Sequence, residues 1–403
     1  MWRSIRALPA PVWWLYVGSF VNRFGSFVSV FLILYLVELG FTPAQAGTAA
    51  AAYGAGSFGA SIVGGFLADR LGRRNAMALS MFSAAATALA LSQAEGLVVI
   101  TALTAAFGLT SDLYRPASAA LLADLVPAER RLPAFAGYRL AINAGFTFGP
   151  AVAGLLAERS FFWLFIGEAA TSTTMGVIAL VALPVGVRTR RGEERRGEGI
   201  RSIAGDRSFV VLLLAVAISA FVYLQSFATL PLHIRDAGLS TTFYGLLISL
   251  NGGLIVLLEL PLVSQIRRFS APRAIATGVA VSGIGFGALA FGAHPGLLIA
   301  AAVTWTIGEI VAAPTGNAYV ANLAPHRLRG RYQGALGMTF SLGLVLAPAI
   351  GTRIYDWSPV GLWTICGALS FVAAAMILPL PSRRVEPDIM PPPTAPDLPG
   401  VET

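Results

Sequence analysis

The sequence contains no lysine, one cysteine and few charged residues. All 28 basic residues are arginines, so neither a lysine Schiff base nor the lysine of a phosphate-binding P-loop can form. Cys366 has no second cysteine to pair with, which excludes a disulfide within the sequence and a cysteine metal cluster. The three histidines lack metal-ligand spacing and no nucleophile–base pair is visible, so we predict no enzyme, no metal and no cofactor.

Charged residues make up 12% of the 403 residues, whereas 56% are hydrophobic. A soluble globular protein carries about twice that charged share. The apolar residues form twelve runs of roughly 20–25 residues, the length of a helix that crosses a bilayer. Backbone groups in hydrocarbon must hydrogen-bond within the protein, which leaves helices or a closed barrel, and alternating strands are absent. We therefore predict an all-α membrane protein with spans near residues 12–37, 44–68, 75–94, 97–122, 134–157, 161–184, 209–234, 241–265, 272–292, 295–321, 331–354 and 359–381.

The placement of arginine predicts the topology. The first six residues resemble the basic start of a signal peptide, but the following apolar run is too long and lacks a small-residue cleavage site, so we interpret it as the first span. The net charge of +8 does not indicate nucleic-acid binding, because the arginines fall in alternate loops and the loops between them hold only Arg159, Arg235 and Arg353. This positive-inside pattern predicts a multi-pass protein of a bacterial cytoplasmic (inner) membrane, with both termini in the cytoplasm.

The two halves of the sequence repeat at an offset of 198 residues, which aligns Pro116 with Pro314 and Pro150 with Pro348. Because proline interrupts the helical hydrogen-bond ladder, matched prolines predict matched helix shapes. A parallel repeat of six spans places a substrate path between the halves. We predict two pseudo-symmetric six-helix bundles, 1–185 and 209–382, with a cytoplasmic linker at 186–208 and a disordered cytoplasmic tail at 383–403.

Two motifs, together with an arginine in the fourth span, relate the sequence to a known family. One motif is the loop between the second and third spans, which joins two glycines, one acid and three arginines: Gly65, Asp69, Arg70, Gly72, Arg73 and Arg74. The other lies in the fifth span and contains Gly145, Gly149, Pro150 and Gly154. With twelve spans, this combination resembles the major facilitator superfamily, in a twelve-helix branch similar to the drug:proton antiporters.

The resemblance implies a role for each motif. In this superfamily the aspartate equivalent to Asp69 caps a helix, pairs with arginine and holds the inner gate closed when the transporter faces outward. The glycines of the fifth span imply a dry seal between the halves that prevents proton leakage in an exchanger. Ordinary close packing of membrane helices is the alternative explanation for these glycines.

Charged side chains at membrane depth cost about 2.5–3.5 kcal/mol each on insertion scales, so they are candidates for function. Glu309, near the middle of span ten, is the strongest candidate for a proton carrier, because burial disfavours a charged carboxylate. Trp305 lies one turn earlier and offers an aromatic face to a cationic substrate. A structural ion pair between Glu309 and an arginine of the other half is the alternative.

Other polar residues are predicted to line the same path. Asp112 and Arg115 share one face of span four, and we predict proton coupling for Asp112 and substrate binding for Arg115 and Arg23. Structural ion pairing is the alternative, with Asp112, Glu259 or Glu309 as partners of Arg23. Tyr223 and Gln225 in span seven are expected to line a cavity and bind substrate. We expect Glu259 to snorkel or to bind Arg267 or Arg268, and Glu168 to be structural.

The sequence therefore predicts a monomeric secondary transporter in a lipid bilayer, with protons and a small molecule as its partners. We expect proton-coupled export of amphipathic or drug-like molecules by alternating access, powered by the proton gradient. The first alternative is proton-coupled import of peptides or other carboxylate-bearing nutrients, with Arg23 and Arg115 as anion-binding residues. A membrane sensor or scaffold is a further alternative, although a scaffold has no need for polar residues deep in the membrane.

Overall fold

The computed structural model describes residues 8–127, 130–185, 205–266, 269–324 and 328–382, and every regular element in these ranges is a helix. The first half contains α2 (Ala10–Phe24), α3 (Phe27–Glu38), α4 (Pro43–Leu71), α5 (Arg73–Leu91), α6 (Leu97–Asp112), α7 (Tyr114–Leu125), α8 (Arg131–Arg159) and α9 (Phe162–Ala182). The second half contains α11 (Arg207–Tyr223), α12 (Gln225–Ala228), α13 (Leu230–Asp236), α14 (Thr241–Ile266), α15 (Ala271–Ala288), η2 (Leu289–Phe291), α16 (Pro295–Leu323), α17 (Arg329–Leu346), η4 (Ala347–Gly351), α18 (Thr352–Trp357) and α19 (Pro359–Ile377).

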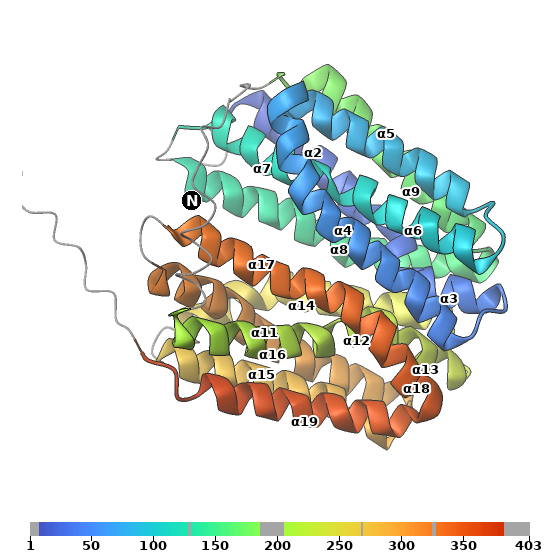
Figure 1. Cartoon of the computed structure of the whole chain (residues 1–403), viewed down its shortest axis with the longest axis vertical. Coiled ribbons are helices and arrows are strands. Elements are labelled where there is room, and N and C mark those ends of the chain that lie inside the picture. The colour runs from blue at the N-terminus through green and yellow to red at the C-terminus, as the bar shows by residue number, and fades with distance from the viewer. Residues whose placement is uncertain (1–7, 128–129, 186–204, 267–268, 325–327, 383–403) are drawn as a thin grey trace, which may run out of the picture.

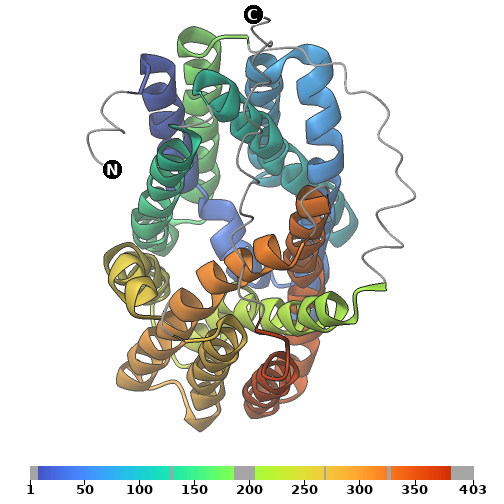
Figure 2. The same cartoon turned by 90° about the vertical axis from the view of Figure 1, so that its left-hand side faces the viewer.

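Eleven helical segments in these ranges are long and apolar enough to cross a membrane. The remaining predicted span is α5, which is helical but less apolar because Arg73, Arg74 and Asn75 occupy its first turn. The prediction of an all-α membrane protein built from two six-helix bundles is confirmed. Figure 2, seen from the end where α4 meets α5, shows the first half in blue to green above the second half in yellow to red.

Several predicted spans are interrupted rather than continuous. The first breaks at Gly25–Ser26, the fourth at Leu113 and the seventh at Leu224 and Thr229. In the eleventh, Pro348 lies in the π-helical turn η4. These breaks place backbone groups and side chains at angles that a straight helix would not allow.

The matched prolines do not produce matched breaks. Pro150 and Pro314 lie inside the unbroken helices α8 and α16, whereas Pro348 interrupts its span and Pro116 follows the break at Leu113. Neighbouring helices can satisfy the backbone groups that a proline frees, so a membrane helix can continue through it. The prediction of matched helix shapes is therefore wrong for these two pairs.

The two bundles meet most closely at one end. We call the end that carries the α4–α5 and α14–α15 connections the arginine-rich end, and the other the opposite end. Figure 1 shows the halves coming together on the right, at the opposite end, where α4 contacts α18 and α3 contacts α13. One cluster of buried apolar residues draws on both halves there, while two smaller clusters each belong to a single half.

The predicted linker and tail fall mostly outside the described residues, as do Arg267 and Arg268 and the first seven residues. At the start of the second half, α11 begins at Arg207, inside the predicted linker. The Asp206 carboxylate caps this helix by accepting a hydrogen bond from the Phe209 amide at 3.1 Å.

Candidate functional site

Two adjoining cavities lie between the halves. The larger, of about 400 Å³, is enclosed by α2, α7 and α8 from the first half and by α11, α14 and α16 from the second. Its lining residues are Arg23, Tyr114, Arg115, Tyr138, Ile142, Asn143, Phe146, Tyr223, Asn251, Gly252, Ile255 and Glu309. It is therefore bounded by arginines on one wall and by an acid on the other.

The smaller cavity, of about 220 Å³, extends from the first toward the opposite end. The two share Arg23, Arg115, Phe146 and Tyr223 as walls. Most of its other lining side chains are apolar, from α3, α12 and α17 among others, so the combined space has one polar and one apolar part.

Glu309 is partly buried in the wall that α14 and α16 form. Asn251 on α14 donates a hydrogen bond from Nδ2 to Glu309 Oε2 at 3.0 Å and lies 2.9 Å from the Thr306 hydroxyl. The hydroxyl of Tyr223 also faces the carboxyl. No ion pair within the described ranges includes Glu309, so its partners are neutral groups rather than an arginine of the other half.

Two residues predicted to bind substrate lie elsewhere. Trp305 is 1% exposed and stacks on Phe286 of α15, with ring centroids 4.9 Å apart. Gln225 is fully buried and donates from Nε2 to the carbonyl oxygens of Phe221 and Ala347, both at 3.3 Å. Neither lines either of these two cavities, because both point into the core of the second half; of the two predicted span-seven residues, only Tyr223 reaches the cavity wall.

The opposite wall carries a cluster of charges around Asp112. Arg115 Nε lies 2.8 Å and Arg23 Nη2 3.9 Å from Asp112 Oδ1, and the Ser57 hydroxyl donates to Oδ2. Asp112 is 4% exposed, whereas the Arg115 side chain is 48% exposed. The acid is thus enclosed by its partners, while Arg115 presents its guanidinium to the cavity.

Local backbone geometry brings this cluster together. The break at Leu113 puts Asp112 at the end of α6 and Arg115 in the first turn of α7. Arg23 occupies the last turn of α2, which packs closely on α8 at Gly145. A Cβ on Gly145 would lie 2.5 Å from the Phe20 carbonyl oxygen and 3.0 Å from the Arg23 Cβ. The glycine therefore helps to place Arg23.

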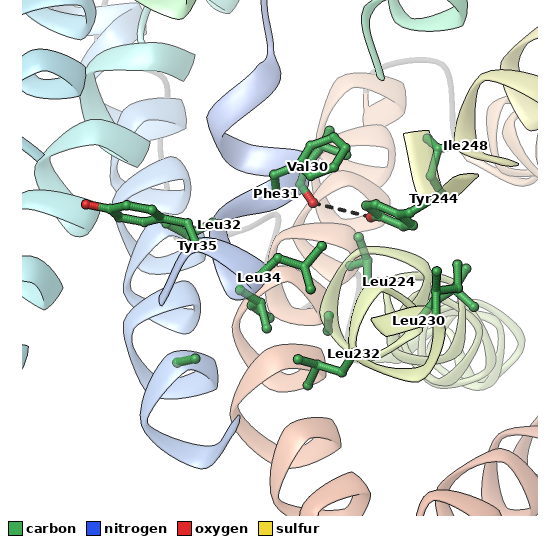
Figure 3. Packing of buried hydrophobic residues seen from close by; sticks show 14 of the residues in the cluster. Val30, Phe31, Leu32, Leu34, Tyr35, Leu224, Leu230, Leu232, Tyr244 and Ile248 are labelled. Atoms are coloured by element: carbon green, nitrogen blue, oxygen red, sulfur yellow. Dashed lines mark hydrogen bonds between the residues drawn. The ribbon is translucent and has the colours of Figure 1, made fainter. Parts of the chain in front are cut away.

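At the opposite end, a seal of apolar side chains closes the space between the halves. The Tyr244 hydroxyl of α14 lies 3.3 Å from the carbonyl oxygen of Val30 in α3 and 3.1 Å from that of Ser226, and Figure 3 shows the first of these bonds. The Phe31 and Tyr244 rings meet edge to face with centroids 5.1 Å apart. Figure 3 also shows Leu34, Leu224 and Leu232 around this contact.

Nearer the arginine-rich end, one ion pair connects the halves. Arg139 Nη2 of α8 lies 2.7 Å from Glu259 Oε1 of α14. The Arg139 side chain is 53% exposed. Glu259 was expected to bind Arg267 or Arg268, which lie outside the described residues; Arg139 is the partner that the structure assigns to it.

The sequence matches the family model of the Major Facilitator Superfamily over residues 15–263 and again over residues 226–397. The chain belongs to the major facilitator superfamily. It is therefore a multi-pass membrane protein of the secondary transporter type.

Similar proteins within the superfamily differ in what they move. The chain is 27% identical to the uncharacterized MFS-type transporter YqjV of Bacillus subtilis (strain 168), which it matches over 88% of each sequence. It is 22% identical to the Na(+), Li(+), K(+)/H(+) antiporter of Planococcus maritimus, over 80% of this chain and 84% of that one. It is 24% identical to the multidrug resistance protein MdtH of Yersinia pestis (strain Pestoides F), over 81% and 83%.

A crystal structure of a mutant peptide transporter POT in complex with sulfate has a similar fold. The TM-score is 0.79, with 18% sequence identity, and the match covers 92% of this chain and 94% of that one. At this identity the likeness concerns the fold alone.

The superfamily loop between α4 and α5 forms a tight turn. Gly72 has φ +86° and separates the two helices, a conformation that glycine adopts without strain. Arg73 forms an ion pair with Asp124 of α7 and donates to the Ala120 carbonyl oxygen at 3.0 Å, with Asp69 close enough to act on it electrostatically. These contacts stay within the first half.

The glycines of the fifth superfamily span face two different partners. Gly145 and Gly149 pack on the backbone of α2 in the same half. Gly154 faces the second half, where a Cβ would lie 2.7 Å from the Thr241 carbonyl oxygen, and the Pro150 carbonyl closely approaches Gly245. The predicted seal between halves therefore concerns Gly154 and Pro150, while the other two glycines position α2.

Sequence reasoning missed several residues of the cavity. Asn251 is the direct partner of Glu309, and its signal was a polar side chain within the apolar run of span eight. Tyr138 and Phe146 line the cavity but look like ordinary apolar positions of a membrane helix. Beside the cavity, Arg139 lies inside the predicted fifth span, and no sequence pattern joins it to Glu259.

Proposed function

We propose that this protein is a proton-coupled exporter of small amphipathic molecules that works by alternating access. The observation that carries the proposal is Glu309, a carboxyl in the wall of the central cavity whose partners are the neutral groups of Asn251 and Tyr223. A carboxyl without a fixed counter-charge gains or loses a proton without leaving a buried arginine unpaired. This property suits a proton carrier.

The two ends of the molecule support alternating access. Apolar side chains around Tyr244 close the opposite end, whereas the Arg139–Glu259 ion pair is a more exposed connection at the arginine-rich end. Exposed ion pairs contribute little, about 0–1 kcal/mol, so this connection is easier to separate than the apolar seal. We infer that Asp69 and Gly65 contribute to a second closed arrangement, at the arginine-rich end, in the other conformation.

Relatives named as a multidrug resistance protein and as a cation/proton antiporter support export. In an exporter of this kind, protonation of Glu309 alternates with binding of the substrate against the cavity wall that contains Glu309. The apolar smaller cavity suits the hydrophobic part of an amphipathic substrate.

Flux measurements in liposomes test the proposal. Purified protein is reconstituted with an imposed pH gradient, a trapped pH indicator and either ethidium or a dialanine peptide as the transported probe. Export by antiport predicts that ethidium and protons move in opposite directions. Movement of the probe together with protons would contradict antiport.

Arg23 and Arg115 favour a second candidate, proton-coupled import of a carboxylate-bearing nutrient. The half-exposed Arg115 guanidinium faces the cavity, and guanidinium groups bind carboxylates with two parallel hydrogen bonds. Under this reading dialanine, and not ethidium, would move in the same direction as protons. Replacing Arg115 by Gln would then abolish dialanine uptake.

A further inference from the structure

The first span breaks in the middle of the membrane, and an acid from another helix holds the broken end. Glu168 of α9 is 4% exposed. Its Oε2 accepts a hydrogen bond from the Val28 amide at 3.0 Å, and the Phe27 amide also hydrogen-bonds to the carboxyl. These amides form the first turn of α3, where a helix leaves donors unsatisfied and carries partial positive charge.

The face of α9 that carries Glu168 is shaped to fit the break. A Cβ on Gly25 would collide with the Thr171 side chain, and a Cβ on Gly167 would lie 2.6 Å from the Phe27 ring. Thr171 is about one helical turn from Glu168 and Gly167, so one strip of α9 receives both sides of the break. The break is therefore held by a specific contact and not by general packing.

The same break connects the cavity with the seal. On one side, Arg23 in the last turn of α2 lines both cavities. On the other, Val30 and Phe31 in α3 contact Tyr244 across the two halves. A change in the direction of α3 relative to α2 would open the seal without requiring the wall of the larger cavity to move.

The repeat shows that a break of this kind does not need an acid. At the offset of 198 residues the equivalent of Glu168 is Cys366, which is buried and uncharged. The broken seventh span satisfies part of its backbone with its own side chains: Gln225 donates to the Phe221 carbonyl oxygen at 3.3 Å, and the Thr229 hydroxyl donates to the Gln225 carbonyl oxygen at 3.4 Å. The fold can therefore form such a break without an acid, and the carboxyl group of Glu168 is an additional feature of the first half.

We propose that Glu168 is a positioning residue for alternating access: its carboxyl group holds the N-terminus of α3 and so keeps α3 against α13 and Tyr244 at the opposite end. The groups that face this carboxylate are Arg23 on α2 and Asp112 on α6, with the Tyr53 hydroxyl on α4. The inference rests on alternating access, which is part of the proposed function. Glu168 itself lines neither cavity.

Distances across the opposite end test the proposal in the purified full chain. Leu39 at the end of α3 and Val360 at the start of α19 are 48% and 58% exposed and belong to different halves, so spin labels on cysteines at these sites report on the seal. The parent protein carries Cys366→Ala. Pulsed electron paramagnetic resonance in lipid nanodiscs then compares the parent with Glu168→Ala, Glu168→Gln and the control Thr174→Ala, an exposed residue of the same helix.

We expect Glu168→Ala to increase the long-distance population several-fold, and Glu168→Gln, which keeps one acceptor oxygen but replaces the other by a donor NH2 group, to increase it in the same direction. Thr174→Ala should match the parent. A purely structural role would lower thermal stability and leave the distances unchanged, and that result in either Glu168 variant would overturn the proposal. Should Glu168→Ala fail to insert, Glu168→Gln decides the question.

The same preparations separate this proposal from the function on which it rests. Unchanged distances together with intact proton-coupled flux in the parent would refute the role of Glu168 alone. Changed distances in a protein that moves no probe under a pH gradient would refute proton-coupled transport and leave the role of Glu168 in place.

Discussion

Asn251 donates a hydrogen bond to Glu309 across 3.0 Å, from α14 to α16, inside the wall of the central cavity. An amide is an uncharged partner that can donate to a carboxylate or accept from a carboxylic acid, so the contact survives a change of protonation. An arginine in the place of Asn251 would have stabilised the charged form of Glu309. The identity of this partner is what distinguishes Glu309 from Asp112, whose carboxylate lies between two guanidinium groups.

Glu309→Gln is expected to reduce proton-coupled flux to the level of empty liposomes, because glutamine keeps the hydrogen bond to Asn251 but carries no transferable proton. Insertion and thermal stability should remain near wild type, since the side chains have nearly the same shape. The measurement is proton movement on addition of the probe, across a series of pH values. The matched control is Glu158→Gln, which changes an exposed acid near the C-terminal end of α8. A Glu309→Gln variant that keeps the wild-type pH dependence would exclude Glu309 as the carrier.

The Arg139–Glu259 ion pair is expected to bias the arginine-rich end toward its closed arrangement by a small amount. Because the Arg139 side chain is 53% exposed, we expect about 0.2–1 kcal/mol for the pair. Arg139→Gln and Glu259→Gln should each raise the long-distance population between spin labels at Pro127 and Phe269, and the exchange Arg139→Glu with Glu259→Arg should restore it. Arg235→Gln is the control, since its partner Asp236 lies in the same half. No recovery in the exchanged variant would show that the pair does not couple the halves.

Tyr244→Phe is expected to weaken the seal at the opposite end. It removes the hydroxyl near the Val30 and Ser226 carbonyl oxygens but keeps the ring contact with Phe31, so we expect a loss of about 0.5–1.5 kcal/mol. The Leu39–Val360 distance measurement should show a several-fold larger open population.

The control for that change is Tyr16→Phe, which removes a hydroxyl bonded at 2.6 Å to the Ala134 carbonyl oxygen within the first half. It should lower thermal stability without opening the seal. Equal distance distributions for both tyrosine variants would mean that the Tyr244 hydroxyl has no specific role at the seal.

Gly65→Ala is expected to separate stability from transport. A Cβ at Gly65 meets nothing within 4 Å, and alanine in the interior of α4 should stabilise the protein by about 0.5–1 kcal/mol. Flux should nevertheless fall, because we infer that the bare face of Gly65 is used in the other conformation. Thermal shift and liposome flux measure the two effects.

Gly59→Ala on the same helix, with only an ordinary contact at 3.6 Å, should stabilise by a similar amount and leave flux unchanged. Gly145→Ala should instead destabilise by about 1–3 kcal/mol, because its Cβ would lie 2.5 Å from the Phe20 carbonyl oxygen. Wild-type flux in Gly65→Ala would refute a gating role for that glycine.

Much of the fold was predictable because a bilayer restricts what a sequence can do. Long apolar runs can satisfy their backbones only as helices, so length and hydropathy place the spans to within a few residues. The breaks at Gly25–Ser26 and Leu113 were not predictable, since several of the side chains that contact them come from distant parts of the chain. Matched prolines predicted matched helix shapes, yet Pro150 lies inside a continuous helix while its counterpart Pro348 lies in a π-helical turn.

The residues of the candidate site were likewise predictable only in part. Membrane-depth charge identified Glu309, Asp112, Arg115 and Arg23, and all four lie at the walls of the two cavities. Residue type alone also suggested Trp305 and Gln225, which point into the core instead. A helix has several faces, and hydropathy that is high all round does not tell which face meets the other half.

The sequence by itself determined the membrane, the twelve helices, their repeat and the superfamily, because these depend on composition and on local patterns. Only the tertiary structure decided which polar residues share a cavity and which pair off. It joined Asn251 to Glu309, Arg139 to Glu259 and Glu168 to the broken end of α3. These partners lie far apart in the chain, and their contacts exist only because helix packing brings specific faces together at a few ångströms, where hydrogen bonds and ion pairs form.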